Sequence, residues 1–263
     1  MIVGYIKSFF AHYGLAVAVA LVYLFLYIPI FIVVIFSFNS VSFPYHWVSF
    51  SWQWYVQLFQ SREIFEALCN SLIVATTSVV LSLTVGVLFV FYSKNCGLNR
   101  LTPLFYGSLL VPEIVIAVSL LSFFMICAIP LGLCTLIAGH TVLGLGYVIP
   151  ILSARLAEVD ASVIEASLDL GATINQTFMR IVLPLLSPAL IASALLVFII
   201  SFDDFFISFF CAGTSAQTLS LYIFAMIRTG VSPTINALST LLLLLSSICV
   251  LILCSLKTKI RIL

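Results

Sequence analysis

Long apolar runs separated by short polar intervals dominate the pattern of hydrophobic and polar positions along this chain. Each run is close to the ~20 residues that an α-helix needs to cross about 30 Å of hydrocarbon. The first run is longer than the apolar part of a signal peptide, so we interpret it as a membrane helix. The pattern predicts an all-α integral membrane protein with six transmembrane helices, at about residues 14–38, 67–93, 103–125, 131–152, 186–206 and 235–256.

Composition supports the same class of protein. Hydrophobic residues make up 63% and charged residues 7% of the 263 residues, whereas an average soluble domain has about 25% charged residues. This composition excludes a soluble globular protein and makes the lipid bilayer the first expected partner. No linker, charge run or clear repeat divides the chain. We therefore interpret residues 1–263 as a single transmembrane domain.

The distribution of lysine and arginine predicts the orientation in the membrane. If the N-terminus lies inside, only Arg62 and Arg228 fall in outer segments. Because cytoplasmic segments are enriched in basic residues, we expect both termini and residues 153–184 to be cytoplasmic. The inner segments would then contain Lys7, Lys94, Arg100, Arg155, Arg180, Lys257, Lys259 and Arg261.

The longest polar interval between apolar runs, residues 153–184, predicts two short helices separated by a glycine. Ser162–Glu165 and Thr173–Gln176 both have the spacing of a capping box, in which two side chains satisfy each other's backbone N–H groups. Gly171 suits the left-handed residue that ends a helix, and Pro184 is expected to stop the second helix. A short helix pair with an apolar face on the cytoplasmic side suggests a docking surface for a soluble partner.

One carboxylate, Glu113, falls inside an apolar run. It lies ten residues into a helix predicted to begin near Pro103, which places it about 15 Å along the axis, near the middle of the bilayer. An ionised carboxylate costs roughly 2.5–3.5 kcal/mol there, and no Lys or Arg of the chain is expected at that depth. We interpret Glu113 as part of a cation pathway. A protonated or solvated structural carboxyl is the alternative.

Two further carboxylates, Asp203 and Asp204, come late in the fifth predicted helix, towards its outer end. Adjacent residues on a helix point about 100° apart, so only one of them is expected to face a pathway squarely. We interpret them as an acidic mouth that receives a cation. Solvated residues at a helix end are the alternative.

Signatures of enzymes, metal sites and nucleotide sites are missing from the sequence. Gly144-Leu145-Gly146 is followed by Tyr147 and not by the aspartate of an intramembrane protease. The three histidines have no metal-ligand spacing, no glycine-rich nucleotide loop is present, and no basic patch suggests nucleic acid. The scattered cysteines are typical of buried hydrophobic residues, although a Cys127–Cys134 pair stays open. We expect no enzyme activity, no metal and no cofactor.

The polar interval contains the motif of a known family. Glu165-Ala166-Ser167, Gly171 and Ile181-x-Leu183-Pro184 have the spacings of the EAA motif, and the chain resembles the permease subunits of ATP-binding-cassette (ABC) importers. Ser167 is the one departure, because the motif has a second alanine there. The resemblance implies a type I (MetI-like) permease fold, in which the EAA helices are cytoplasmic coupling helices seated on an ATPase. That role would fall on Glu165, Ala166, Ser167, Gly171, Ile181, Leu183 and Pro184.

The resemblance extends from about Tyr27 to Lys257 and includes the spermidine/putrescine permeases of the family. Where those permeases have an aspartate, this chain has Glu113. The matching stretches are Tyr27-Ile28-Pro29, Ser37-Phe38-Asn39-Ser40, Pro112-Glu113-Ile114-Val115, Asp169-Leu170-Gly171-Ala172, Asp203-Asp204, Gly230-Val231-Ser232-Pro233 and Asn236-Ala237-Leu238.

The resemblance implies a permease subunit of the bacterial inner membrane that forms a polyamine pathway, with Glu113, Asp203 and Asp204 along it. The expected partners are a second homologous permease subunit, two cytoplasmic ATPase subunits and a periplasmic polyamine-binding protein. The alternatives are an ABC permease for another small solute and an ion-coupled secondary transporter, which would also carry carboxylates within the membrane.

Overall fold

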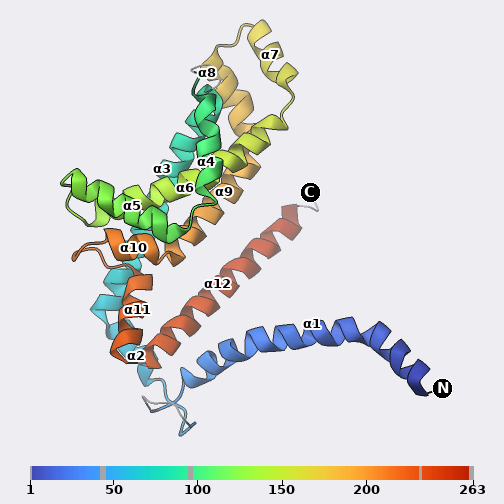
Figure 1. Cartoon of the computed structure of the whole chain (residues 1–263), viewed down its shortest axis with the longest axis vertical. Coiled ribbons are helices and arrows are strands. Elements are labelled where there is room, and N and C mark those ends of the chain that lie inside the picture. The colour runs from blue at the N-terminus through green and yellow to red at the C-terminus, as the bar shows by residue number, and fades with distance from the viewer. Residues whose placement is uncertain (1, 42–45, 94–96, 231–232, 261–263) are drawn as a thin grey trace. The chain divides into compact units, whose positions relative to one another are not determined.

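The computed structural model describes residues 2–41, 46–93, 97–230 and 233–260. Within these residues the regular structure is helical, and β-structure is limited to one bridge between Asn39 and Phe50. The chain divides into two compact units, residues 1–62 with 225–263 and residues 63–224. Figure 1 labels the helices of both units.

The first unit contains α1 (Ile2–Phe36), α2 (Gln53–Gln60) and α12 (Pro233–Ile260), and both α1 and α2 pack against α12. The most apolar stretch of α1, within Gly14–Phe36, has a mean hydropathy of 2.9 and no buried residue. A helix satisfies its own backbone groups, so its apolar side chains are free to face lipid. α1 therefore has the properties of the first predicted transmembrane helix.

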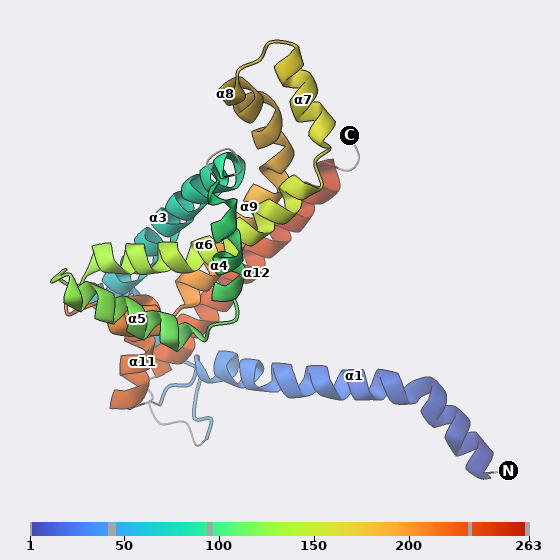
Figure 2. The ribbon, with the colours of Figure 1, turned by 45° about the horizontal axis from the view of Figure 1, so that its top comes forward.

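The second unit is built on three long helices, α3 (Arg62–Tyr92), α6 (Leu133–Ala157) and α9 (Leu183–Asp203), of which α6 and α9 pack along each other. α5 (Glu113–Ile126) and α10 (Phe206–Cys211) pack together near the start of α6 and the end of α9. α7 (Ala161–Asp169) and α8 (Ile174–Thr177) lie at the opposite end (Figures 1 and 2). α4 (Thr102–Ser108) packs on α6, and α11 (Leu219–Thr229) follows α10.

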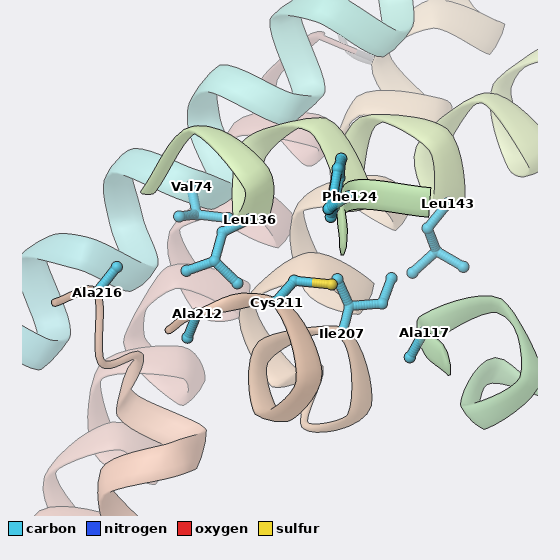
Figure 3. Packing of buried hydrophobic residues seen from close by; sticks show 9 residues of the cluster. All are labelled: Val74, Ala117, Phe124, Leu136, Leu143, Ile207, Cys211, Ala212 and Ala216. Carbon is cyan, nitrogen blue, oxygen red and sulfur yellow. The ribbon is translucent and has the colours of Figure 1, made fainter. Parts of the chain in front are cut away.

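Two clusters of buried apolar side chains hold the second unit together. The cluster in Figure 3 lies where α5 and α10 meet α6, and it consists of Val74, Ala117, Phe124, Leu136, Leu143, Ile207, Cys211, Ala212 and Ala216. The other joins α3, α6 and α9 and consists of Val87, Val90, Val148, Ile149, Leu152, Phe178, Val182, Leu186 and Val197. One cluster thus supports each end of the α6–α9 pair.

The predicted membrane helices are matched in part. Four helices of the described residues are long and apolar enough to cross a membrane: Gly14–Phe36, Arg62–Tyr92, Leu133–Ala157 and Ile174–Asp203. The α4–α5 pair makes a fifth candidate if its two helices form one broken span. The sixth predicted helix, residues 235–256, falls in α12, whose side chains are described only as far as Ile248. The count of six therefore stays a prediction.

The continuous helix predicted over residues 103–125 is wrong. α4 ends at Ser108, α5 begins at Glu113, and the two helices are bent by 116°. Pro112 provides the physical reason, because proline has no N–H to donate and disfavours a helical conformation at the preceding Val111. Pro112 itself has φ −56° and ψ 136°. Glu113 is thus the first residue of α5 and not, as predicted, the middle of a long helix.

The prediction that Pro184 stops the second polar helix is also wrong. α8 continues through a π-helical turn, Phe178–Val182, directly into α9. In a regular α-helix the ring of Pro184 would clash with the carbonyl of Arg180. The π turn widens the helix at this point, and Leu183 N donates to the carbonyl of Phe178, five residues back. The polar interval is therefore continuous with the apolar helix that follows it.

Candidate functional site

The first arm of the predicted helix pair is α7, and its cap differs from the prediction. Asp160 is the N-cap, and its Oδ1 accepts the backbone N–H of Ser162 at 3.0 Å. The capping box predicted for Ser162 and Glu165 is therefore wrong, because the acceptor lies two residues earlier. The hydrogen bond from Ser162 holds the pKa of the exposed Asp160 carboxyl below its usual value. A carboxylate also suits the positive end of the helix dipole.

The turn between the two arms follows the prediction closely. Gly171 has φ +85°, in the left-handed region. The N–H of Gly171 donates to Leu168 O at 2.9 Å and the N–H of Ala172 donates to Ser167 O at 3.1 Å, which together form a Schellman motif. The capping box of the second arm is confirmed, since Thr173 and Gln176 each accept the other's backbone N–H. We call residues 160–184 the hairpin.

The residues of the EAA motif occupy different layers of the hairpin. Glu165, Ala166, Gly171 and Pro184 are exposed, Ile181 and Leu183 are half-buried, and Ser167 is buried. Beside them lies a groove of about 260 Å³, mostly apolar, between α7, α8 and the adjoining ends of α3 and α6. It is lined by Phe91, Leu156, Val159, Ala161, Ile164, Leu168, Ile174 and Thr177. The hairpin thus combines an exposed motif surface with an adjacent apolar groove.

The second set of predicted residues lies around the two helix breaks. Glu113, half-buried at the start of α5, lines a cavity of about 430 Å³ formed by the α4–α5 break and one side of α6. Tyr147 and Gly146 of α6 form part of its opposite wall. Glu113 also lines a second cavity of about 270 Å³ with Asp203 and Asp204. The structure therefore brings the three predicted carboxylates together, and Glu113 belongs to both cavities.

The two aspartates have opposite orientations in this arrangement. Asp203 is exposed, whereas Asp204 is buried at 6% exposure. Oδ1 of Asp204 accepts the N–H of Ile207 at 3.3 Å and Oδ2 accepts the N–H of Ser208 at 2.9 Å, so its carboxylate caps the start of α10. Both aspartates line the 270 Å³ cavity, so the prediction that only one of them faces a pathway squarely stays a prediction. The rest of the 270 Å³ cavity is apolar and aromatic: Ile199, Ile200, Phe205 and Phe206.

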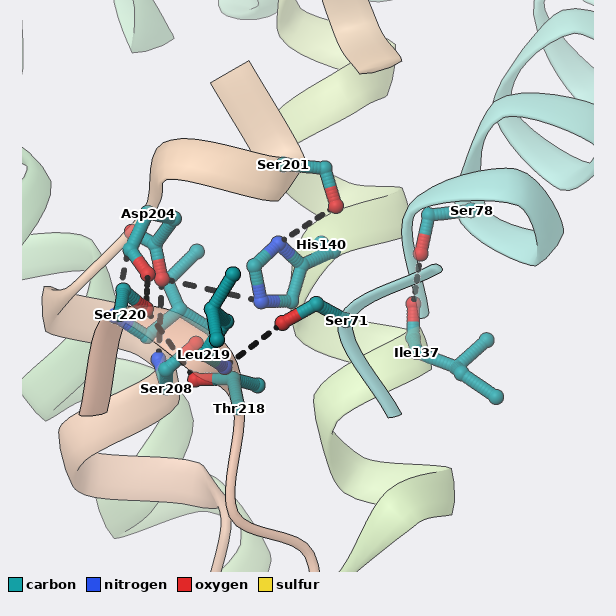
Figure 4. A network of polar contacts seen from close by, with 11 residues as sticks. Ser71, Ser78, Ile137, His140, Ser201, Asp204, Ser208, Thr218, Leu219 and Ser220 are labelled. Atoms are coloured by element: carbon teal, nitrogen blue, oxygen red, sulfur yellow. Dashed lines mark hydrogen bonds and ion pairs between the residues drawn. The ribbon is translucent and has the colours of Figure 1, made fainter. Parts of the chain in front are cut away.

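The sequence analysis missed a polar network beside this cavity. Figure 4 shows His140 of α6 between Ser201 and Asp204, with Ser208, Thr218 and Ser220 nearby. Ser220 Oγ donates to the backbone oxygen of Asp204 at 2.7 Å. The available signal was a histidine in the middle of an apolar run, a position where a polar side chain needs a partner. Its partners come from α9 and beyond, more than sixty residues away along the chain.

No group of three or more potential metal ligands is found among the described residues. Cys127 and Cys134, whose pairing the sequence left open, are both free and exposed. The 270 Å³ cavity is lined by carboxylates and aromatic rings, and such groups attract and orient a cation.

Comparison with known proteins places these features in a family. Residues 78–259 match the model of the family described as binding-protein-dependent transport system inner membrane component. The spermidine/putrescine transport system permease protein PotC of Haemophilus influenzae is 36% identical over 213 residues, which cover 80% of this chain and 83% of that protein. The putrescine transport system permease protein PotI of Escherichia coli is 35% identical over 221 residues, covering 80% and 79%.

Solved structures resemble the fold at lower sequence identity. A chain of a bacterial ABC transporter involved in import of the acidic polysaccharide alginate has a TM-score of 0.71 and 16% identity, over 95% of this chain and 96% of that one. A chain of the MetNI methionine ABC transporter in an inward-facing conformation has a TM-score of 0.56 and 22% identity, over 80% and 98%. These similarities confirm the predicted all-α, MetI-like permease fold.

Proposed function

This chain belongs to the family of binding-protein-dependent transport system inner membrane components, and from that premise we propose that it is the permease subunit through which an ABC importer takes up polyamines. Its relatives PotC and PotI are permease proteins of spermidine/putrescine and putrescine transport systems. A permease moves its cargo without changing it, so the chain is a transport component and not an enzyme.

The observation that carries the choice of cargo is the convergence of Glu113, Asp203 and Asp204 on one cavity. A polyamine has several ammonium groups separated by methylene segments. Carboxylates suit the ammonium groups, and the neighbouring aromatic rings of Phe205 and Phe206 suit both methylenes and cations. Polar groups within a membrane protein are costly, so a cation that neutralises these carboxylates is a fitting occupant. The described lining of this cavity contains no basic side chain that would bind an anionic cargo.

The hairpin is the proposed contact with the ATPase. Its exposed surface contains Glu165, Ala166, Gly171 and Pro184, with Ile181 and Leu183 behind them and Ser167 buried. The Schellman turn and two capped arms give it a defined shape without a partner. The adjacent apolar groove offers the kind of surface that a soluble subunit covers on binding.

A single continuous helix supports communication between the two sites. The helix from Ile174 to Asp203 starts in the hairpin and ends at the 270 Å³ cavity of Glu113, Asp203 and Asp204, which we call the acidic cavity. It spans 30 residues, or about 45 Å. Because the π turn keeps this helix unbroken past Pro184, a displacement of the hairpin is carried to Asp203. ATP-driven closure of the ATPase subunits would thus change access to the cavity.

The proposed assembly follows from these contacts. Two cytoplasmic ATPase subunits would seat the hairpins, a second homologous permease subunit would complete the pathway, and a periplasmic polyamine-binding protein would deliver the cargo. The hairpin and both termini would lie on the cytoplasmic side of the bacterial inner membrane, in agreement with the excess of basic residues there. The exposed apolar side chains of α1 suit a position in the lipid bilayer.

The test is uptake of labelled spermidine by cells that lack their own polyamine uptake and that express this subunit with its partner subunits. The same cells with an ATPase-inactivating change in the partner serve as the control. We expect uptake that requires ATP hydrolysis, is competed by putrescine, and falls in Glu113→Gln without loss of complex assembly. Uptake that continues without ATPase activity would contradict the importer and favour an ion-coupled secondary transporter. An ATPase-dependent complex without polyamine uptake would keep the importer and point to another small solute.

A further inference from the structure

His140 is the centre of a buried network that the proposed cargo route does not itself use. It lies in the first third of α6 and is 1% exposed. Its Nδ1 lies 3.0 Å from Ser201 Oγ in the last turn of α9, and its Nε2 lies 3.6 Å from Asp204 Oδ2 just beyond that turn (Figure 4). One imidazole ring thus contacts two side chains at the end of α9.

Asp204 depends on this neighbour because its carboxylate is buried, with a side-chain exposure of 1%. Two backbone N–H groups, of Ile207 and Ser208, donate to it. A buried carboxylate remains costly unless further polar or charged groups surround it. Within the described part of the chain, His140 is the only basic side chain at ion-pair distance from Asp204.

The hydrogen-bond pattern favours one tautomer of the imidazole. If Ser201 Oγ donates to Nδ1, the proton of the neutral ring is on Nε2 and points towards Asp204 Oδ2. The other tautomer would place a nitrogen lone pair against a carboxylate oxygen, which is repulsive. At 3.6 Å from Asp204 Oδ2 the Nε2 of His140 is at ion-pair distance and not at hydrogen-bond distance, and it has no hydrogen-bond partner among the described residues. The electrostatic contact with Asp204 is therefore what that nitrogen provides.

We propose that His140 is a positioning residue for the acidic cavity. Its Nε2–H keeps Asp204 turned inward as the cap of α10, and this fixes the break between α9 and α10 that leaves Asp203 exposed beside Glu113. Without the imidazole the buried carboxylate loses its neighbour, the end of α9 relaxes, and Asp203 leaves its place in the cavity. The expected effect on polyamine uptake rests on the proposed function, whereas the expected effect on the α9–α10 break does not.

Two variants of His140 separate positioning from simple packing. The amide of asparagine overlies the Nδ1 side of the ring and keeps the contact with Ser201, whereas the amide of glutamine overlies Nε2 and keeps a donor towards Asp204. In the assembled transporter reconstituted in proteoliposomes, His140→Asn should raise the half-saturating spermidine concentration about tenfold, because the buried Asp204 carboxylate loses the one N–H that faces it from α6. His140→Gln should stay within about twofold of the wild type.

A control variant measures general loosening of the same helix. Ser78→Ala removes a buried hydrogen bond from Ser78 Oγ to Ile137 O, 3.2 Å long, between α3 and α6. It should lower thermal stability with little change in the half-saturating concentration. In the Asp204→Asn background, His140→Asn should add no further change, because the partner of Nε2 is already altered.

Hydrogen exchange of the Ile207 and Ser208 amides supplies a readout that needs no cargo. These amides donate to Asp204, so His140→Asn should accelerate their exchange and His140→Gln should not. Equal effects of the two variants on exchange and on half-saturation would make His140 a packing residue and overturn the proposal. If the wild type takes up no polyamine while exchange still separates the variants, the proposed cargo is wrong and the positioning role stands.

Discussion

Ser167 Oγ lies 2.9 Å from Thr177 Oγ1, and this contact joins α7 to α8 within the hairpin. Ser167 is 8% and Thr177 1% exposed. The EAA motif has an alanine at the position of Ser167, so the hydroxyl provides a hydrogen bond that the motif does not require. It fixes the two arms to each other directly behind the exposed Glu165 and Ala166.

Replacing Ser167 by alanine tests this contact. The variant leaves the buried Thr177 hydroxyl without its partner, which should destabilise the hairpin by about 1–3 kcal/mol. The arms should then move more independently, and each cargo molecule imported should consume more ATP. Thermal unfolding of the purified complex and the ratio of uptake to ATP hydrolysis check the two effects.

The double variant Ser167→Ala with Thr177→Val is the matched control. It removes both polar partners and leaves no buried hydroxyl unpaired, so it should be more stable than Ser167→Ala alone. A double variant that is no more stable than the single one would show that the hydroxyl pair does not hold the arms together.

Gly171 should tolerate asparagine and not valine. No atom lies within 4 Å of a Cβ built on Gly171, so a substitution there meets no crowding and acts through its φ of +85° alone. A β-branched residue in that conformation costs roughly 1–2 kcal/mol, whereas asparagine enters it more readily. Gly171→Val should reach the membrane but co-purify with less ATPase, and Gly171→Asn should retain both. Equal ATPase recovery for the two variants would count against the hairpin as the ATPase contact.

Local sequence signals predicted the hairpin turn well. Gly171 and the Thr173–Gln176 box act on neighbouring residues only, so their geometry follows from a few positions. The same local reasoning placed the first cap at Ser162 when a stronger acceptor, Asp160, stood two residues earlier. It also stopped the second arm at Pro184, because it did not allow for a π turn that absorbs the proline.

The sequence predicted which carboxylates belong to the acidic cavity but not how they are arranged. Charges within apolar runs identified Glu113, Asp203 and Asp204, since such residues are costly and need a reason to be there. Their arrangement depends on the break at Pro112 and on the break after α9, which bring distant segments together. His140 could not be linked to Asp204 from spacing, because the contact exists only once α6 and α9 have packed.

Asp203 and Asp204 should respond differently to the same substitution. Asp203 is exposed and faces the cavity, so Asp203→Asn should raise the half-saturating polyamine concentration by about tenfold and leave thermal stability unchanged. Asp204 caps α10 from a buried position, so Asp204→Asn should lower the thermal midpoint of the complex as well as transport. Uptake kinetics and unfolding of the purified complex measure the two effects. If Asp203→Asn destabilised the complex as much as Asp204→Asn, the assignment of Asp203 to cargo binding and Asp204 to helix capping would be wrong.

Gly144 lies where α6 closely approaches both α9 and α3. A Cβ built there would lie 2.9 Å from Val197 Cγ1 of α9 and 3.0 Å from Ser82 Cβ of α3. Small residues permit such close helix packing in membranes. Gly144→Ala should therefore push α6 away from α3 and α9 and lower stability by about 1–3 kcal/mol, the usual effect of overpacking.

Gly107→Ala provides the comparison for this last variant, because no atom lies within 4 Å of a Cβ built on Gly107. Alanine is the better helix former by about 1 kcal/mol, so this change in α4 should be neutral or stabilising. Thermal unfolding of both purified variants in the same detergent shows whether only Gly144→Ala is destabilising. If Gly144→Ala unfolded at the wild-type temperature, α6 and α9 would have room to separate without loss.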